Sequence, residues 1–394
     1  MDKKNKTPNV PNLRFKEFHT EWKKLQIGNL IKERKEYTSD FEKYPLYSFT
    51  LESGITPKSE RYERSFLVKK EGDLFKIVHQ NDFVMNPMNL RFGALNYSKI
   101  NQTVSVSGYY DIFTIDECKY NEFWNAYFKT PRMIYTYNTI ATGSLVEKKR
   151  VYFKQLKELK MYIPNDMEKN KINEFINLLN ERIQTQIKII ELKQSLIKDI
   201  EDRILWKSTN THSRPISDFI VELNDKSKIQ NQYPLLSSTK RGLFLQTDYF
   251  NKEAASSNNI GYKIVHKGDI IISPQNLWMG NITYNDKFDN GLVSPSYRIY
   301  KVKEEYNAFY ISRILMSYRA LSLYKNISEQ GASIVRRNLN VDAFNELCFP
   351  IPDIKKQDEV GLFLSKLHQE LNSEIEILRQ LKNQKKYLLC NLFI

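Results

Sequence analysis

Two polar loops at matching places in the chain carry the side chains best suited to recognition chemistry. Residues 86–91 and residues 273–278 each follow a short apolar run and contain a proline at the second position. Asparagine and glutamine can form bidentate hydrogen bonds to adenine, and arginine to guanine, in the major groove of DNA. We therefore predict base contacts from Asn89, Arg91, Gln275 and Asn276. The alternative is that these side chains only cap a hairpin loop.

Basic residues recur after a late glycine in both halves of the chain. Gly143 is followed by Lys148, Lys149 and Arg150, and Gly331 is followed by Arg336 and Arg337. A merely solvated face has no reason to repeat its charge, so we predict phosphate contacts from these five residues. The alternative is a solvated charge cluster.

A second basic set lies where the two halves differ most in sequence, at residues 49–70 and 238–259. Its members are Lys58, Arg61, Arg64, Lys240 and Arg241. We predict that they face phosphates, although an isolated lysine or arginine is usually only a solvated charge. These divergent segments are also where we expect the two halves to differ in what they recognise.

The sequence lacks the motifs of a DNA methyltransferase and of an ATP-binding enzyme. A methyltransferase needs a glycine-rich turn after a strand and an Asn/Asp-Pro-Pro-aromatic loop, whereas residues 86–88 contain a single proline. The sequence has no Gly-x-x-x-x-Gly-Lys loop for ATP, and its 3 cysteines and 5 histidines do not occur at metal-ligand spacings. We predict no catalytic residue, no metal site and no cofactor bound by this chain.

The overall charge points to a polyanionic partner. The formal net charge is +14 over 394 residues, which favours nucleic acid as the partner. The alternative is that the many lysines only reflect the codon bias of the source genome. The first residues are charged, and no apolar run reaches the roughly 18 residues of a membrane span. We therefore expect a cytoplasmic protein with no membrane partner.

The chain is an internal duplication. Residues 75–79 match residues 262–266, Tyr44-Pro45 matches Tyr233-Pro234, and Gly93 matches Gly280. So many matches at one offset of about 190 residues indicate two copies of one unit. Each copy begins with short β-branched and aromatic runs typical of strands.

Each copy ends in a long helical pattern. From about Asn170 to Leu205, and again at the end of the sequence, apolar residues alternate in steps of three and four, as in a coiled coil. The predicted fold class is α+β: two tandem recognition domains, residues 1–164 and 207–352, followed by spacer helices, residues 165–206 and 353–394, that pair as an antiparallel coiled coil. A helix of about 35 residues is ~50 Å long, which would place two readers over separate major grooves and predicts a two-part target.

Several short motifs carry a resemblance to a known family. They are the opening residues 10–15 with Trp22, the turns at residues 79–82 and 266–269, the proline before each long helix, and the leucines of residues 378–392. With the duplicated order, they make essentially the whole chain resemble the specificity (S) subunit of a type I restriction-modification system.

The resemblance implies a non-catalytic subunit with two target recognition domains. Each domain would read one half of an interrupted double-stranded DNA site. The helices would dock two methyltransferase (M) subunits, and restriction (R) subunits could join the assembly. S-adenosylmethionine, ATP and Mg²⁺ would be bound by those partner subunits. The alternative is a coiled-coil homodimeric DNA-binding scaffold without a restriction-modification role, in which the helices pair between chains.

Overall fold

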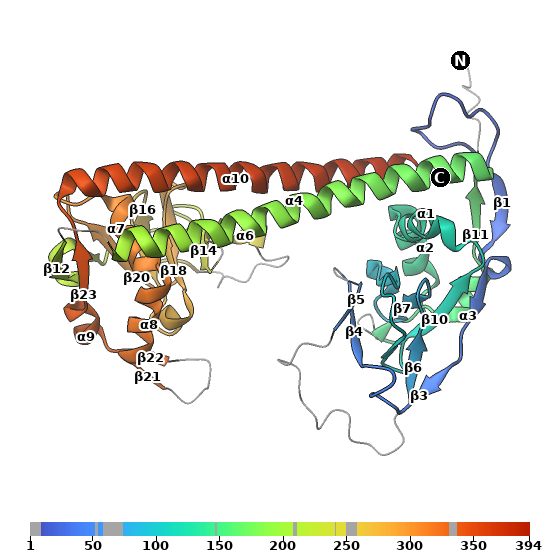
Figure 1. The fold of residues 1–394 in the computed structure, drawn as a ribbon, viewed down its shortest axis with the longest axis horizontal. Coiled ribbons are helices and arrows are strands. Elements are labelled where there is room, and N and C mark those ends of the chain that lie inside the picture. The colour runs from blue at the N-terminus through green and yellow to red at the C-terminus, as the bar shows by residue number, and fades with distance from the viewer. Residues whose placement is uncertain are drawn as a thin grey trace. The chain divides into compact units, whose positions relative to one another are not determined.

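Short aliphatic and aromatic runs form the strands of the chain, and two long helices follow them (Figure 1). The computed structural model describes residues 9–51, 54–57, 74–145, 148–207, 211–240, 242–249, 258–330 and 337–394. It divides into two units: unit 1 is Met1–Gln186 with Ile377–Ile394, and unit 2 is Ile187–Glu376. The helices α4 (Asp166–Trp206) and α10 (Ile354–Asn391) each contribute one part to each unit.

Unit 1 is built around a four-stranded antiparallel sheet of order β2-β10-β7-β8. Its strand β7 is buried at every position. The elements before α4 are β1 (Lys23–Gln26), β2 (Ile31–Glu33), β3 (Tyr37–Thr38), β4 (Tyr47–Thr50), β5 (Gly54–Pro57), β6 (Phe75–Val78), β7 (Phe83–Met85), η4 (Leu90–Phe92), β8 (Leu95–Tyr97), β9 (Val104–Val106), β10 (Asp111–Ile115), α1 (Asn121–Phe128), α2 (Pro131–Ile140), α3 (Phe153–Glu158) and β11 (Lys160–Ile163).

Unit 2 repeats this plan, with a four-stranded sheet of order β13-β20-β17-β18. Its inner strand β17 is again buried at every position. The elements between the long helices are β12 (His212–Pro215), α5 (Ile216–Phe219), β13 (Ile220–Leu223), β14 (Leu236–Thr239), β15 (Gly242–Leu245), α6 (Gln246–Tyr249), β16 (Lys263–His266), β17 (Ile270–Ile272), η7 (Leu277–Met279), β18 (Ile282–Tyr284), β19 (Asn290–Val293), β20 (Arg298–Val302), α7 (Ala308–Met316), α8 (Tyr318–Asn326), β21 (Ser328–Gln330), β22 (Arg337–Leu339), α9 (Val341–Glu346) and β23 (Cys348–Ile351).

The same turn leads into β7 in unit 1 and into β17 in unit 2. In unit 1, Asn81 adopts a φ of 70°, and the carboxylate of Asp82 accepts a hydrogen bond of 2.9 Å from the backbone N–H of His79. In unit 2, Gly268 has a φ of 93°, and Asp269 accepts at 2.7 Å from His266 N–H. Both turns need a residue that tolerates left-handed backbone, which asparagine and glycine do at little cost.

A break at Thr130 separates two helices of unit 1. The sequence predicts a helix from about Asn121 to Phe128, with a possible extension to Tyr135; α1 has the predicted bounds, and the residues beyond the break form the separate helix α2. The Thr130 hydroxyl accepts a hydrogen bond from Met133 N–H, and Pro131 takes the first helical position. A side-chain cap followed by proline starts a new helix, because proline lacks the N–H that an internal position needs.

The long helices contact each other inside each unit. In unit 1, Lys385 Nζ of α10 donates to Asn180 Oδ1 of α4 at 2.5 Å. In unit 2, Lys193 of α4 donates to Glu374 of α10 at 2.9 Å, and Glu201 of α4 lies 2.9 Å from His368 of α10. Residue numbers rise along α4 as they fall along α10, so these contacts are antiparallel. Regular coiled-coil packing along the helices stays a prediction, while the fold of two repeated α+β units with long helices is confirmed.

Candidate nucleic-acid interface

The side chain of Asn86 caps the start of loop 1 (residues 86–93). Asn86 Oδ1 accepts hydrogen bonds from the backbone N–H groups of Met88 and Asn89, at 3.1 and 3.3 Å. The 3₁₀-helix η4 then ends at Gly93, whose φ of 86° allows the chain to turn back into β8. Asn89 makes no side-chain cap and is exposed. Asn86 therefore caps the loop, and Asn89 is left facing solvent, where it could meet a base edge.

Loop 2 (residues 273–280) has the same backbone. Asn276 N–H donates to Ser273 O at 3.1 Å, and Gly280 closes η7 with a φ of 90°. Gln275 is exposed, whereas Asn276 is half-buried. The predicted base-contact residues Asn89 and Asn276 thus occupy equivalent positions, each immediately before a 3₁₀-helix.

Arg91 is placed differently from the other predicted base contacts. Its side chain is only 8% exposed, and its guanidinium carbon lies 5.1 Å from the centre of the Phe92 ring. Asn138 of α2 donates to the Arg91 carbonyl at 3.1 Å and fixes this turn of the loop. A base contact from Arg91 would require the side chain to leave this buried position, while Phe92 is 60% exposed beside it.

The basic cluster after Gly143 lies against loop 1. Arg150 pairs with Thr142 through two backbone hydrogen bonds of 2.9 Å, and the next residue, Val151, donates from N–H to Pro87 O at 3.0 Å. The Arg150 guanidinium lies 5.4 Å from the Tyr109 ring. Burial raises the pKa of the Tyr109 hydroxyl, with the charge of Arg150 acting in the opposite direction. Lys148 is exposed and Lys149 half-buried in the same segment.

Unit 2 repeats this arrangement with Arg337. Its backbone N–H donates to Gln275 O at 3.2 Å, so β22 lies against loop 2. Its guanidinium carbon lies 5.6 Å from the Trp278 ring. Predicted base and phosphate contacts are therefore adjacent in both units. Sequence reasoning missed the supporting rings of Tyr109 and Trp278, because each ring lies far along the sequence from the arginine that it contacts.

Three buried polar atoms at loop 2 have no hydrogen-bond partner among the described residues. They are Asn276 Oδ1, Trp278 Nε1 and Arg337 Nε. A buried donor or acceptor without a partner costs about 1–3 kcal/mol. Such a group is explained by a bound ligand, water or stored strain. Their clustering at one loop marks it as a place where a polar ligand would gain hydrogen bonds.

The remaining predicted phosphate contacts are spread elsewhere. Lys240 is exposed in the turn after β14. The other four, Lys58, Arg61, Arg64 and Arg241, lie outside the described residues, as does Arg336. Within the described ranges no cluster of metal-ligating side chains is found. None of the helices in those ranges carries an apolar stretch that would cross a bilayer.

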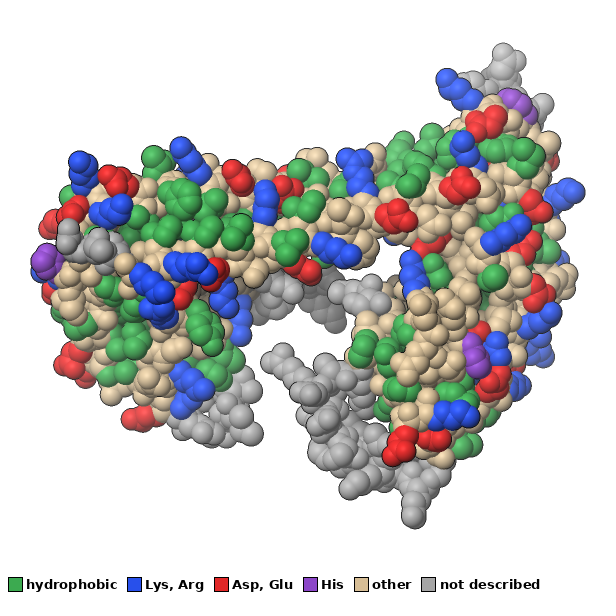
Figure 2. Space-filling model, in the orientation of Figure 1, with side chains coloured by type: hydrophobic (Ala, Val, Ile, Leu, Met, Phe, Trp, Pro, Cys, Tyr) green, Lys and Arg blue, Asp and Glu red, His purple; other side chains and the backbone are tan. Residues whose placement is uncertain are grey.

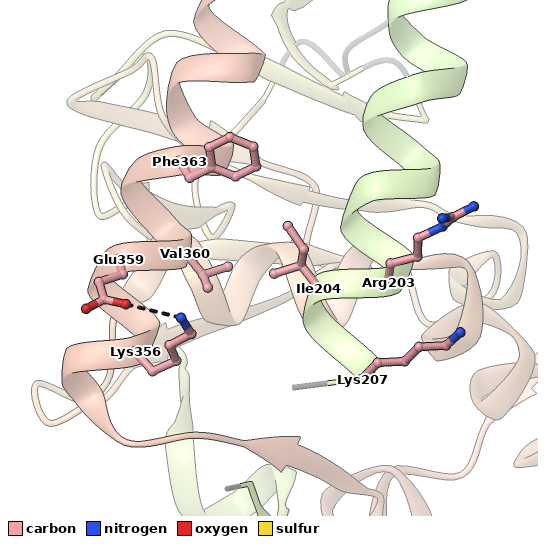
Figure 3. Close-up of a pocket in the computed structure, with 7 residues that line it drawn as sticks. All are labelled: Arg203, Ile204, Lys207, Lys356, Glu359, Val360 and Phe363. Atoms are coloured by element: carbon pink, nitrogen blue, oxygen red, sulfur yellow. Dashed lines mark hydrogen bonds and ion pairs between the residues drawn. The ribbon is translucent and has the colours of Figure 1, made fainter. Parts of the chain in front are cut away.

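A different kind of site lies in unit 2 between the last turn of α4 and the first turns of α10. This groove of about 450 Å³ is lined by Arg203, Ile204, Lys207, Lys356, Glu359, Val360 and Phe363. Ile204 and Val360 point toward each other, and Lys356 pairs with Glu359 at 3.2 Å (Figure 3). Hydrophobic side chains gather over this part of α10 (Figure 2), where Leu362 is 59% and Phe363 46% exposed. The groove suits an apolar partner surface better than DNA.

The arginines against the two loops can be tested for phosphate contact. Arg337→Gln is expected to weaken binding to every duplex sequence and to reduce the slope of log affinity against log salt by about 0.9, because one phosphate contact is lost. Arg150→Gln should do the same from unit 1. The control is Lys355→Gln, which removes an exposed charge at the start of α10, outside both loops. Equal slopes for Arg337→Gln and the control would refute the assignment.

Comparison with known proteins gives one consistent result. No protein-family model matches the chain, and no curated protein matches its sequence. Among solved structures, the type I restriction-modification S subunit from M. genitalium superposes with a TM-score of 0.55 at 14% identity, over 98% of this chain and 99% of that one. A chain from a structure on complex assembly and conformational transition of the type I R-M system gives 0.51 at 10% identity, over 93% and 96%. From end to end, the chain has the fold of a type I restriction-modification specificity subunit.

Proposed function

We propose that this chain is the specificity subunit of a type I restriction-modification complex. It reads a two-part double-stranded DNA site, one half with each unit, and positions methyltransferase and restriction subunits. The observation that carries the proposal is the duplicated reader: each unit presents a glycine-closed loop with an exposed amide side chain, Asn89 or Gln275, and an arginine segment bonded to that loop. Two such readers in one chain suit an interrupted site.

In this proposal the partner subunits carry out the catalysis. The chain itself is non-catalytic, and S-adenosylmethionine, ATP and Mg²⁺ bind to the methyltransferase and restriction subunits. The exposed apolar groove of unit 2 is the surface we assign to a partner subunit, because contiguous exposed apolar side chains usually mark a protein interface. The homodimeric scaffold is not favoured, since α4 and α10 contact each other within one chain.

The proposal is tested by mapping methylated positions across the genome. Cells carry the cognate methyltransferase subunit with this chain or without it. A two-part motif with a fixed gap that appears only with the chain supports the specificity role. If the partner is active and no motif depends on this chain, the proposal fails.

Substitutions in the two loops should then separate the half-sites. Asn276→Ala is expected to lose about 1–3 kcal/mol of discrimination against a wrong base, in one half of the motif only, because a bidentate amide contact is removed. Asn89→Ala is the matched control, since it occupies the equivalent position in unit 1 and should relax the other half. The measurement is duplex binding with each half varied in turn. Relaxation of both halves by either variant would contradict separate readers.

A further inference from the structure

A buried carboxylate in unit 1 gathers three polar neighbours. Glu122 of α1 is 4% exposed. Its Oε1 accepts from the Tyr97 hydroxyl at 2.8 Å and from the ammonium of Lys99, and its Oε2 accepts from Asn180 Nδ2 of α4 at 2.9 Å. The side chain of Lys99 is 62% exposed, so this ion pair joins a surface lysine to a buried carboxylate.

Two further lysines bring more positive charge than this carboxylate can balance. Lys385 of α10 donates to Asn180 Oδ1 at 2.5 Å. Lys129 lies at the end of α1, and its ammonium has no hydrogen bond or ion pair within the described part of the chain. Burial lowers the pKa of Lys129 to about 8, and the charge of Lys385 acts in the same direction. Burial also lowers the pKa of Lys385. An anion beside these ammonium groups would relieve their repulsion.

The fold does not require lysines at this corner. In unit 2, Phe309 stands at the position of Glu122 and Met316 at that of Lys129. Tyr284 contacts Phe309 with ring centres 6.0 Å apart, as Tyr97 contacts Glu122. In the other copy, the positions of Glu122 and Lys129 are therefore occupied by apolar side chains. The positive cluster of unit 1 calls for a reason other than packing.

The cluster borders the loop proposed to read DNA. A Cβ atom added at Gly93, the last residue of loop 1, would lie 4.0 Å from Cγ of Lys129. An anion held by Lys129 would thus lie beside loop 1. The anion nearest to a base-reading loop is a phosphate of the same duplex, and lysine suits phosphate as a point charge with several donors.

We propose that Lys99, Lys129 and Lys385 form a binding site in unit 1 for a phosphate group of the DNA backbone. The site rests on the proposed function, because its ligand is part of the duplex that loop 1 reads. It would fix the position of the duplex on unit 1 and carry no base preference. The corresponding positions of unit 2 carry no lysine, since Asp286 and Met316 occupy the positions of Lys99 and Lys129.

The test uses Lys129→Met, which copies the residue found in unit 2. Binding of the full chain to a duplex with the mapped motif is measured over a range of salt. Lys129→Met is expected to bind every duplex several-fold more weakly and to reduce the salt slope by about 0.9, with motif preference unchanged. Lys129→Arg keeps the charge and should keep the slope. Lys99→Gln with Lys129→Met should reduce the slope by about twice as much.

Each outcome decides the matter. A Lys129→Met slope equal to that of the wild type overturns the site. Equal losses in Lys129→Met and Lys129→Arg also overturn it, because charge would then not be the cause. Thermal stabilisation by inorganic phosphate that Lys129→Met abolishes, with the DNA slope unchanged, assigns the lysines to a free phosphate and refutes the backbone contact. A wild-type chain that binds no duplex overturns the proposed function together with this site.

Discussion

Replacing Arg313 with methionine is expected to lower the free energy of unfolding of unit 2 by about 3–5 kcal/mol, because a buried carboxylate loses its partner. Glu201 of α4 has a side chain only 8% exposed. The Arg313 guanidinium of α7 donates to both of its oxygens, at 2.6 and 3.0 Å. His368 of α10 adds a third contact at 2.9 Å. One carboxylate therefore joins three helices of unit 2.

The matched control is the double variant Glu201→Met with Arg313→Met. A buried ion pair replaced as a whole by apolar side chains of similar volume is often neutral, since the cost of taking both charges out of water is also removed. We expect the double variant to regain most of the lost stability. Hydrogen exchange of the α7 amides (Ala308–Met316) measures the effect within unit 2. If the double variant is as unstable as Arg313→Met, the loss comes from packing and the ion-pair argument is wrong.

The same carboxylate predicts how the stability of unit 2 depends on pH. Burial acts to raise the pKa of Glu201, but the hydrogen bond with His368 and the charge of Arg313 outweigh it, so the pKa lies below its ordinary value of 4.5. A carboxylate with a depressed pKa stabilises the fold above its ordinary pKa, and this contribution is lost as the pH falls through the folded value. The stability difference between wild type and Glu201→Gln should therefore be constant near neutral pH and shrink below about pH 4.5.

The duplication explains how much of the fold the sequence could predict. A residue pattern seen once is ambiguous, but the turns at Asp82 and Asp269 both have a histidine three residues earlier, and the structure gives them the same hydrogen bond. The long helices were predictable for a related reason, because apolar residues spaced by three and four over many turns are typical of a long helix. Local chemistry and repetition together were enough for the order of elements.

The candidate site was less predictable, because side-chain direction depends on packing between distant segments. Arg91 lies in a loop of suitable composition, yet the structure buries it beside α2. Arg150 and Tyr109 are far apart in sequence, and nothing local indicates that they stack. The lysine cluster around Glu122 combines residues from β8, α1, α4 and α10 with their neighbouring turns, so no stretch of sequence contains its pattern.

The end of α10 is a second place where packing between distant segments decides which side chain is buried. The sequence predicts a spacer helix over residues 353–394 whose last apolar position is Leu392. In the structure α10 ends at Asn391, and Phe393 is buried in the core of unit 1, at 6% exposure. Its ring centre lies 5.0 Å from that of Tyr127, 5.3 Å from that of Phe123 and 6.4 Å from that of Trp22. The Tyr127 hydroxyl also donates to Ile394 O at 3.3 Å.

Phe393→Ala is therefore expected to destabilise unit 1 by about 3–5 kcal/mol, the cost of removing a large buried aromatic side chain from a core. Amides of α1 (Asn121–Phe128), which carries Phe123 and Tyr127, should lose protection from hydrogen exchange by that amount. Amides of α7 in unit 2 should not change. The control is Phe363→Ala, since a phenylalanine that is 46% exposed should contribute within about 0.5 kcal/mol.

Phe393→Ala also tests whether the two units unfold independently or together. If unit 1 is completed by residues 377–394, its core forms only when α10 has been added, and the DNA recognition that we propose for unit 1 depends on a side chain hundreds of residues from loop 1. Phe393→Ala should then weaken reading of the half-site assigned to Asn89 and leave that assigned to Asn276 unchanged. Equal loss of protection in α1 and α7 would show instead that the two units unfold together. In that case the long helices would transmit stability between the readers, and neither could be altered alone.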